Sequence, residues 1–458
     1  MTLLPVLRGF GADRADAVTV AGKALSSEAL LGCVTAVADR IRGATAVAVD
    51  GTPTLEAVVG MLGALLAGAP LVPLPPGADE RERRRILRQS GATVILGRAP
   101  SGADGLSTIP VDLREHASTR HPEPAPGSDA VILYTGGTSG PPRGVRISRR
   151  AIAADLDLLA RAWHWSEEDV VVQGTPLFRA YGLVVGLLGA LRAGSRFVHL
   201  DDAGTAGPVG SMHLASPDQW ARIALDGHRA RPLSAARILV SADGPLARAV
   251  AERLRLLTSH RPVQAYGTTE TLVALTGRAG DRTVPGAVGT PLPGVETRVL
   301  DREDRPVPAD GQSAGELSVC GPTLFSGYVG GRSLAAGRWH ATGDLASVAP
   351  DGTYRIIGRC GLDVVHSRGR RMPTGQIEEA LLSHPGVRDA AVVGTPHHAL
   401  GEQVTAYVVA EGVTAQVLID HVGRYLSAGQ RPRRVHFVDE LPRSAFGRIR
   451  KSLLIARG

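Results

Sequence analysis

The sequence repeats one pattern of helix, glycine and strand, and this repeat restricts the fold more than any other feature. Residues 60–74 read GMLGALLAGAPLVPL, and residues 186–200 read GLLGALRAGSRFVHL. Each copy has an apolar run long enough for a helix, a glycine suited to a left-handed helix end, and a short strand. Such a helix covers a largely buried sheet. The repeat predicts two related αβ layers, with chance likeness between two apolar helices as the alternative.

The length and texture of the chain predict more than one domain. Its 458 residues are about three times a typical domain length, and 43% of them are hydrophobic. Residues 101–129 are rich in Gly, Pro, Ser and His, which is typical of a connector. From about residue 360 short predicted helices and strands follow one another closely. We expect an α/β protein with a large domain over residues 1–358 and a small α+β domain over residues 359–458.

The charge pattern argues against a nucleic-acid partner. The net charge is +7 at pH 7, but the arginines are dispersed and form no patch interleaved with aromatic residues. Only Lys23 and Lys451 are lysines. Such an arginine bias is more typical of a GC-rich genome than of a surface that binds nucleic acid.

The cysteines and the longest uncharged segment predict a cytoplasmic protein without a membrane span. Three cysteines lie far apart, fit no metal spacing and indicate a reducing compartment. No secretion signal is evident at the N-terminus. Residues 57–77 are uncharged, but prolines interrupt their second half. This segment is predicted to be a buried helix followed by a strand.

A glycine-rich loop follows the strand-like residues 130–133. Residues 134–145 read YTGGTSGPPRGV, in which glycines let backbone N–H groups converge on an anion. Thr135, Thr138 and Ser139 add hydroxyl donors, and Arg143 adds positive charge. No Gly-Lys-Ser/Thr closes the loop, so it is not a Walker A loop. Taken alone, it is either a phosphate cradle or a flexible surface turn.

Two further motifs each contain a lone carboxylate. QAYGTTET spans residues 264–271, and Glu270 in it is a candidate Mg²⁺ ligand. Magnesium in nucleotide sites typically takes one or two carboxylates together with phosphate oxygens. TGDL spans residues 342–345, where the carboxylate of Asp344 suits two ribose hydroxyls. Taken singly these motifs are weak, because Gly-Asp commonly forms only a turn.

In this order the motifs resemble those of the adenylate-forming superfamily, which contains acyl- and aryl-CoA synthetases, peptide-synthetase adenylation domains and luciferase. The loop resembles the family's Tyr-Thr-Ser-Gly-Thr-Thr-Gly-x-Pro-Lys-Gly-Val signature, and QAYGTTE matches its Tyr-Gly-x-Thr-Glu motif. Further similar segments are PLFRAYGL, SADGPL, VGTPLPGVE, GELSVCGPTLFSGY and RGRRMPTGQIEEALLSHPGV. The resemblance covers nearly the whole chain. It implies a large N-terminal domain of two related αβ-layered subdomains plus a small barrel-like part, and a small mobile α+β C-terminal domain.

The resemblance implies an ATP site assembled from several segments. The residues expected to line the phosphates are Thr135, Gly136, Gly137, Thr138, Ser139, Gly140 and Arg143. The residues expected to contact adenine or the α-phosphate are Tyr266, Gly267, Thr268 and Thr269. Glu270 would hold Mg²⁺, and Asp344 would bind both ribose hydroxyls with the support of Arg359.

The resemblance also implies an acid pocket and a reaction. The expected pocket residues are Phe178, Tyr181, Gly182, Ala242, Asp243, Gly244 and Ala265. ATP would convert a small carboxylic acid to an acyl adenylate with release of pyrophosphate, and a thiol of CoA or of a carrier protein acting in trans would displace AMP. Such an enzyme needs cations and N–H dipoles where charge builds up on the α-phosphate and the carboxylate. Between the half-reactions the small domain would rotate about a hinge at residues 359–363, with Asp363 as its pivot.

Several residues depart from the family pattern. Gly136 and Arg143 replace a serine and a lysine of the loop, and Arg149 and Arg179 each stand where histidine is common. The catalytic lysine of the C-terminal motif falls on Arg448 in LPRSAFGRIRKSLL. With these departures included, the resemblance assigns catalysis to four residues, Thr269, Glu270, Arg179 and Arg448.

Arg448 is the departure with the largest consequence. Lys451 lies three residues further on, about 10 Å away and on the opposite face of an extended segment, so it is not expected to replace the lysine directly. The arginine bias accounts for Arg143, because any cation can meet a phosphate. A guanidinium is planar and bulkier than an ammonium. We expect Arg448 still to assist adenylation. The alternatives are that it slows the first half-reaction or that it marks a different use of the scaffold.

Arg179 and Asp243 give the clearest indication of the acid. A carboxylate in the pocket suits a substrate amine or hydroxyl, and Arg179 suits a second anionic group. We therefore expect a polar aromatic or amino-bearing acid rather than a fatty acid. The alternative is that the two side chains pair with each other or face solvent.

Two functions stand beside the acid–thiol ligase. One is a ligase that passes the acyl adenylate to an amine or another nitrogen nucleophile. The other is a degenerate protein that binds nucleotide without catalysis. The presence of Glu270, Asp344 and Arg359 argues against the second, because a decayed site would be free to lose them.

Overall fold

The computed structural model describes residues 2–9, 13–98, 101–102, 105–135, 142–200, 210–281, 284, 286–301, 303–335, 337–360, 363–367, 370–443 and 449–456. The chain divides into two compact units. The first comprises Met1–Thr135, Pro142–Glu296 and Cys320–His340, and the second is built chiefly from Thr297–Val319 and Ala341–Gly458. The second unit thus joins the C-terminal region to strands that precede residue 359. The domain boundary at 358/359 stays a prediction.

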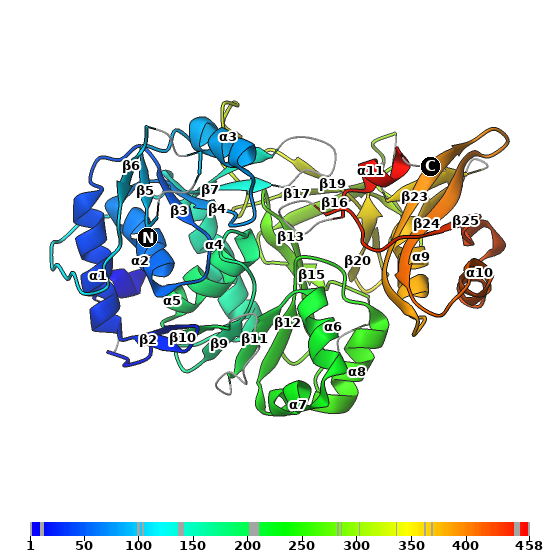
Figure 1. The fold of residues 1–458 in the computed structure, drawn as a ribbon, viewed down its shortest axis with the longest axis horizontal. Coiled ribbons are helices and arrows are strands. Elements are labelled where there is room, and N and C mark those ends of the chain that lie inside the picture. Colours follow the sequence, from blue (N-terminus) through cyan, green and yellow to red (C-terminus); the bar gives the residue numbers. More distant parts are fainter. Residues whose placement is uncertain are drawn as a thin grey trace. The chain divides into compact units, whose positions relative to one another are not determined.

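A seven-stranded mixed sheet lies in the first unit (Figure 1). Its central strands pair in parallel, and β8 and β18 are added at one side by antiparallel pairing. In sheet order the strands are β18 (Gly327–Tyr328), β8 (Arg143–Ser148), β7 (Asp129–Thr135), β4 (Leu71–Leu74), β3 (Val47–Asp50), β5 (Val94–Leu96) and β6 (Ser107–Ile109). The segment predicted to be a connector, residues 101–129, therefore contributes one short edge strand, β6.

A nine-stranded mixed sheet forms the second layer of the first unit (Figure 1). Six neighbouring strands, β13 to β1 in sheet order, pair in parallel, and the outer strands pair antiparallel. The order is β15 (Thr290–Pro291), β14 (Leu272–Thr276), β13 (Val263–Thr268), β12 (Ile238–Ser241), β11 (Met212–Ala215), β9 (Val170–Gln173), β10 (Arg196–His199), β1 (Val18–Val20) and β2 (Lys23–Leu25).

Both copies of the sequence repeat form a helix, a left-handed glycine and a strand. In the first copy α2 (Leu55–Ala67) ends at Gly68, whose φ is 83°, and leads into β4. In the second copy the π-helix η2 (Tyr181–Leu188) continues as α5 (Gly189–Ala193), ends at Gly194 with φ 75°, and leads into β10. Because β4 and β10 belong to different sheets, the prediction of two related αβ layers is confirmed.

The first unit contains further helices. They are η1 (Pro5–Arg8), α1 (Ser27–Arg40), α3 (Glu80–Ser90), α4 (Arg149–Trp163), α6 (Pro217–Leu225), α7 (Gly227–Ala230), η3 (Arg231–Ala235) and α8 (Arg248–Thr258). Trp220 of α6 and Leu254 of α8, both fully buried, meet Leu239 of β12 in one core. Among the described helices, none is long and apolar enough to cross a membrane. The uncharged residues 57–77 form most of α2 and then β4, as predicted.

The second unit contains two sheets (Figure 1). The first has the order β16 (Glu296–Leu300), β17 (Gly315–Cys320), β19 (His340–Val348) and β20 (Tyr354–Arg359). The second has the order β22 (Arg370–Pro373), β21 (Val364–Ser367), β24 (Gly401–Ala410) and β23 (Val387–His397), with β25 (Arg434–Phe437) paired to β24. Its helices are α9 (Thr374–Leu382), α10 (Ala415–Gly423), η4 (Ala428–Gln430) and α11 (Lys451–Ile455).

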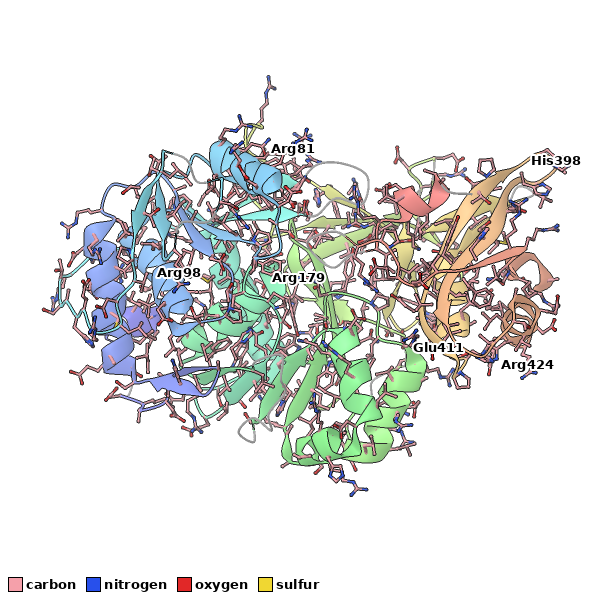
Figure 2. All side chains as sticks on the ribbon, viewed as in Figure 1. Arg81, Arg98, Arg179, His398, Glu411 and Arg424 are labelled. Carbon is pink, nitrogen blue, oxygen red and sulfur yellow. The ribbon has the colours of Figure 1, made fainter. Side chains whose placement is uncertain are left out.

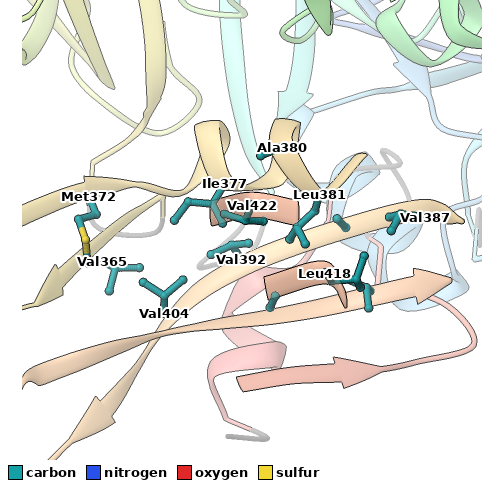
Figure 3. Close-up of a cluster of buried hydrophobic side chains, with 13 residues drawn as sticks. Val365, Met372, Ile377, Ala380, Leu381, Val387, Val392, Val404, Leu418 and Val422 are labelled. Carbon is teal, nitrogen blue, oxygen red and sulfur yellow. The ribbon is translucent and has the colours of Figure 1, made fainter. Parts of the chain in front are cut away.

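Apolar side chains on both faces of the β23–β24 pair form two buried clusters in the C-terminal region. Ile377 of α9 and Leu418 of α10 pack on one face with Val392 (Figure 3). Leu454 of α11 packs on the other face with Val393 and with the other members of a second buried cluster. The C-terminal region is therefore an α+β structure with helices on two sides of its sheet, which agrees with the expected fold class.

Candidate nucleotide and acid site

Most of the expected site residues belong to the described part of the chain. The six that lie outside it are Gly136, Gly137, Thr138, Ser139, Gly140 and Arg448. The first unit holds Thr135, Arg143, Phe178, Arg179, Tyr181, Gly182, Ala242, Asp243, Gly244, Ala265, Tyr266, Gly267, Thr268, Thr269 and Glu270. The second unit holds Asp344, Arg359 and Asp363. Each group is described within its own unit.

Tyr328 contacts two residues of the expected phosphate and metal site, Glu270 and Arg143. Its hydroxyl donates a hydrogen bond to Oε1 of Glu270 at 3.1 Å. The guanidinium carbon of Arg143, the residue at which the glycine-rich loop enters β8, lies 3.6 Å from the centre of the same ring. Burial, and then the charge of Glu270, raise the pKa of Tyr328 to about 12. Tyr328 therefore stays a protonated donor across the physiological range of pH.

The aromatic neighbours of Tyr328 complete this cluster. Phe325 meets Tyr328 edge-on with ring centres 4.9 Å apart, and meets His340 in the same way at 5.1 Å. The backbone N–H of Phe325 also donates to the carbonyl oxygen of Glu270 at 2.8 Å. Burial is the main cause of a lowered pKa at His340, which favours the neutral ring. Glu270 is thus held through both its backbone and its carboxylate.

Glu270 fits the role of a magnesium ligand. Mg²⁺ prefers oxygen ligands and often takes a single carboxylate in a nucleotide site. Among the described residues, no group of three His, Cys, Asp or Glu gathers as a metal site of protein ligands alone. A carboxylate with one oriented oxygen agrees with a metal held mainly between the protein and substrate phosphates.

The turn before Glu270 is fixed by an unusually close backbone approach. A Cβ at position 267 would lie 1.6 Å from the carbonyl oxygen of Leu272, so only glycine fits there. Leu272 itself has φ 53°, a left-handed conformation that is strained for a leucine. Thr271 stabilises the turn, because its Oγ1 accepts a hydrogen bond from the N–H of Thr268 at 2.9 Å. Gly267 and Thr268 therefore shape the backbone that presents Glu270.

Asp155, a residue that the sequence reasoning missed, supports the same turn from α4. Its side chain is fully buried, and Oδ1 accepts a hydrogen bond from the N–H of Val273 at 3.1 Å. The other oxygen, Oδ2, has no hydrogen-bond partner among the described residues. Burial holds the pKa of Asp155 well above the usual range, which favours the protonated, neutral carboxyl group.

Arg179 and Asp243 form an ion pair with each other within the expected acid pocket. Their side chains are 23% and 15% exposed (Arg179 is labelled in Figure 2). Asp243 has φ 72°, a left-handed conformation that Asp tolerates better than most residues. The pairing is one of the alternatives that the sequence left open.

Tyr181 contributes a buried hydroxyl group to the same region. The residue is 7% exposed, and its hydroxyl has no hydrogen-bond partner among the described residues. Burial, followed by the charge of Asp243, raises its pKa above the usual range. An unsatisfied buried hydroxyl beside an ion pair is free to bind a polar substrate group.

The π-helix that carries Tyr181 lies very close to neighbouring backbone. A Cβ at position 182 would lie 2.3 Å from the carbonyl oxygen of Pro176, so Gly182 allows the turn to sit directly on that segment. Nε2 of Gln173 donates to the carbonyl oxygen of Gly182 at 2.9 Å. Such wide turns recur at functional sites.

In the second unit Asp344 and Arg359 face each other across neighbouring strands. They are paired in the register of β19 and β20, and Nε of Arg359 lies 3.3 Å from Oδ1 of Asp344. Asp344 is buried, and its N–H donates to Oγ1 of Thr342 at 3.1 Å. This pairing agrees with a supporting role for Arg359. The ribose contact stays a prediction.

Asp363, the predicted pivot, lies beside Lys451 within the second unit. Oδ2 of Asp363 accepts a hydrogen bond from the N–H of Arg359 at 2.9 Å, and its Oδ1 pairs with the ammonium group of Lys451. Lys451 is therefore engaged within the described structure. This agrees with the expectation that it does not replace the family's catalytic lysine.

Comparison with known proteins identifies one enzyme family in both the N-terminal and the C-terminal parts of the chain. A family model described as AMP-binding enzyme matches residues 17–329, and one described as AMP-binding enzyme C-terminal domain matches residues 376–448. The chain is 29% identical over 394 residues to a mitochondrial malonate–CoA ligase of Mus musculus, covering 74% of this chain and 67% of the relative. The match to the relative of that name from Xenopus laevis covers 64% of its length.

Solved structures extend this similarity to the fold. A malonyl-CoA ligase in complex with methylmalonyl-CoA and AMP is 37% identical and has a TM-score of 0.74, with coverage of 96% of this chain and 100% of that chain. ATP-bound MatB from Rhodopseudomonas palustris is 26% identical and has a TM-score of 0.87, with coverage of 100% and 99%. The fold and the matched motifs are those of AMP-forming acid–thiol ligases of the acyl-CoA synthetase type. The chain belongs to the AMP-binding enzyme family, within the adenylate-forming superfamily.

Proposed function

We propose that this protein activates a small carboxylic acid with ATP and then transfers the acyl group to the thiol of CoA. The observation that carries this proposal is the hydrogen bond from Tyr328 to Glu270, together with the stacking of Arg143 on the same ring. It joins the strand that follows the glycine-rich loop to the carboxylate of the QAYGTTE motif. The family match over residues 17–329 supports a nucleotide at this place.

Each residue has a distinct task in this proposal. Glu270 would hold Mg²⁺, which when bound neutralises phosphate charge and lowers the cost of pyrophosphate departure. Arg143 would supply further positive charge near the phosphates. Asp344, held by Arg359, would bind the ribose hydroxyls. The substrate carboxylate would then attack the α-phosphate, and the thiol would later displace AMP.

For the acid, the ion pair of Arg179 and Asp243 favours a substrate with a second polar group. Asp243 would accept a hydrogen bond from an amine or hydroxyl, and the buried hydroxyl of Tyr181 would add another contact. This supports a polar aromatic or amino-bearing acid. A second candidate is a short acid with a second anionic group, because three of the proteins compared above are named for malonate or malonyl-CoA.

A panel of acids tests both the reaction and its substrate. Pyrophosphate release would be measured with malonate, methylmalonate, benzoate, anthranilate and dodecanoate, each with ATP and Mg²⁺. Release with a polar aromatic or short dianionic acid is expected, and best turnover with dodecanoate would contradict the polar pocket. The absence of release with every acid, in a protein shown to bind AMP, would favour the degenerate nucleotide-binding protein.

The acceptor is tested by the mass of the product. A thioester with CoA is expected, whereas a product formed only with a carrier protein or an amine would favour those alternatives. A cytoplasmic location also stays a prediction, supported by the free thiols of all three cysteines, Cys33, Cys320 and Cys360.

A further inference from the structure

Lys451 is a buried cation with three acceptors around it. It begins α11 and is 8% exposed. Its Nζ lies 2.6 Å from Oε1 of Glu378, donates to Oγ1 of Thr374 at 2.9 Å, and pairs with Oδ1 of Asp363. An ammonium group has three N–H donors and no acceptor. Every donor of Lys451 is therefore satisfied, by residues from two other segments of the second unit.

The identity of this residue agrees with a specific requirement for an ammonium group. The chain has 51 basic Lys and Arg residues, of which only Lys23 and Lys451 are lysines. Lys23 is exposed, whereas Lys451 is buried. A planar guanidinium presents a fork of five donors and does not fit three acceptors arranged around one nitrogen. Position 451 thus has a lysine although the chain otherwise strongly favours arginine.

The local charges favour a permanently protonated Lys451. Burial alone would lower its pKa, but the charges of Glu378 and Asp363 outweigh burial and raise the pKa above its ordinary value. Two carboxyl groups share one ammonium group here. Burial is also the main cause of a raised pKa at Glu378. Loss of the ammonium group would leave two carboxyl groups close together without a counter-charge.

Asp363 transmits this arrangement to Arg359. While Oδ1 pairs with Lys451, Oδ2 accepts the N–H of Arg359 at 2.9 Å. The N–H of Asp363 donates to the carbonyl oxygen of Arg359 at 3.1 Å, and its own carbonyl oxygen accepts the N–H of Thr374 at 2.8 Å. The turn after β20 is therefore closed by the side chain that Lys451 holds.

Arg359 in turn pairs with Asp344 at 3.3 Å. A continuous series of contacts thus runs from Lys451 through Asp363 and Arg359 to Asp344. We propose that Lys451 is a positioning residue for nucleotide binding, which acts through Asp363 to hold Arg359 against Asp344. The inference rests on the proposed function only in taking Asp344 as the ribose ligand.

The decisive experiment is AMP binding, measured by calorimetry without acid or CoA. We expect Lys451→Met to weaken AMP binding by about tenfold, the order of one charge-assisted contact. Lys23→Met, at the exposed lysine, is the matched control and is expected to bind as the unchanged protein does. In steady-state assays Lys451→Met should raise KM for ATP by a similar factor, with less than about a twofold change in KM for the acid.

Further variants keep the inference falsifiable where Lys451→Met does not fold. Lys451→Arg keeps the charge and is expected to weaken AMP binding as well, while Glu378→Gln leaves the Lys451–Asp363 pair and should weaken it less. Normal AMP affinity in folded Lys451→Met or Lys451→Arg protein would overturn the inference. So would equal increases in KM for ATP and for the acid. Failure of the unchanged protein to bind AMP would instead count against the proposed function.

Discussion

The hydroxyl of Tyr328 lies 3.1 Å from Oε1 of Glu270, 58 residues earlier in the chain. The guanidinium of Arg143 rests on the same tyrosine ring. One side chain thus touches both the proposed magnesium ligand and the cation of the glycine-rich loop. The hydrogen bond orients the carboxylate, and the ring holds the guanidinium by a cation–π contact, so the two functions of Tyr328 are separable by mutation.

We expect Tyr328→Phe to weaken the response to magnesium. The variant keeps the ring under Arg143 but removes the donor to Glu270. The Mg²⁺ concentration for half-maximal activity should rise about three- to tenfold, in line with about 1 kcal/mol for one hydrogen bond. Pyrophosphate release titrated with Mg²⁺ at saturating ATP measures this effect.

Tyr328→Leu is the matched comparison, because it removes both the hydroxyl and the ring. It should cost roughly a further 0.5–1 kcal/mol in the apparent affinity for ATP, the usual size of an exposed cation–π contact. An unchanged magnesium requirement in Tyr328→Phe would show that Tyr328 does not orient Glu270.

Local patterns in the sequence predicted the layers of the fold well. The repeat of helix, glycine and strand predicted both αβ layers, because each copy contains its own helix end and its own buried strand. The π-helical start of the second copy was not predicted. In this helix Gly182 closely approaches the carbonyl oxygen of Pro176, a contact that no hydrophobic period encodes.

The sequence proposed site residues only where a recognisable motif contains them. Tyr328 was missed although it ends the segment GELSVCGPTLFSGY, because its partner Glu270 comes from a distant motif. Asp155 had a weaker signal: helical spacing places it on the buried face with Ile152 and Leu159. A lone carboxyl group on an apolar helix face indicates a buried hydrogen bond, but the partner, Val273, is set by the tertiary fold alone.

Asp243→Asn tests whether the charge of Asp243 contributes to recognition of the acid substrate. The amide removes the negative charge that now pairs with Arg179. If the acid has an amine, its kcat/KM should fall by about tenfold or more, since a charged hydrogen bond is worth about 1.5–3 kcal/mol. KM for ATP should not change.

The same variant distinguishes an amine-bearing acid from the second candidate, a short dianionic acid. With a dianionic acid such as malonate, loss of the charge of Asp243 removes its ion pair with Arg179 and a repulsion of the substrate, so kcat/KM should rise instead. Arg179→Met is the complementary variant and should lower turnover of the dianionic acid. Equal kinetics of both variants and the unchanged protein with every acid would exclude the ion pair from substrate recognition.

Asp155→Asn is expected to stabilise the protein at neutral pH. Burial raises the pKa of Asp155 in the folded state, so the folded protein keeps a proton that the unfolded chain releases above about pH 4. The free energy of unfolding therefore falls as pH rises from the unfolded pKa toward the folded one. An amide has no such proton, and its oxygen can still accept the N–H of Val273.

Thermal unfolding from pH 4 to pH 8 measures this effect. The advantage of Asp155→Asn should grow with pH and vanish near pH 4. Asp155→Ala should be destabilised at every pH by about 1–3 kcal/mol, because the buried N–H of Val273 loses its acceptor. A stability difference that does not depend on pH would show that the carboxyl group is not held neutral.

The resemblance places Arg448 where the family's C-terminal motif has its catalytic lysine, so we expect its loss to act on the first half-reaction. Arg448→Ala is expected to slow adenylate formation by at least about tenfold, the order of one lost charge-assisted contact. Arg448→Lys should keep or raise the rate, because an ammonium group restores the family's residue. Single-turnover pyrophosphate release reports this step, and thioester formation from supplied acyl adenylate reports the second. Arg143→Lys is the matched control, since a phosphate contact accepts either cation, and unchanged adenylation in Arg448→Ala would exclude Arg448 from the reaction.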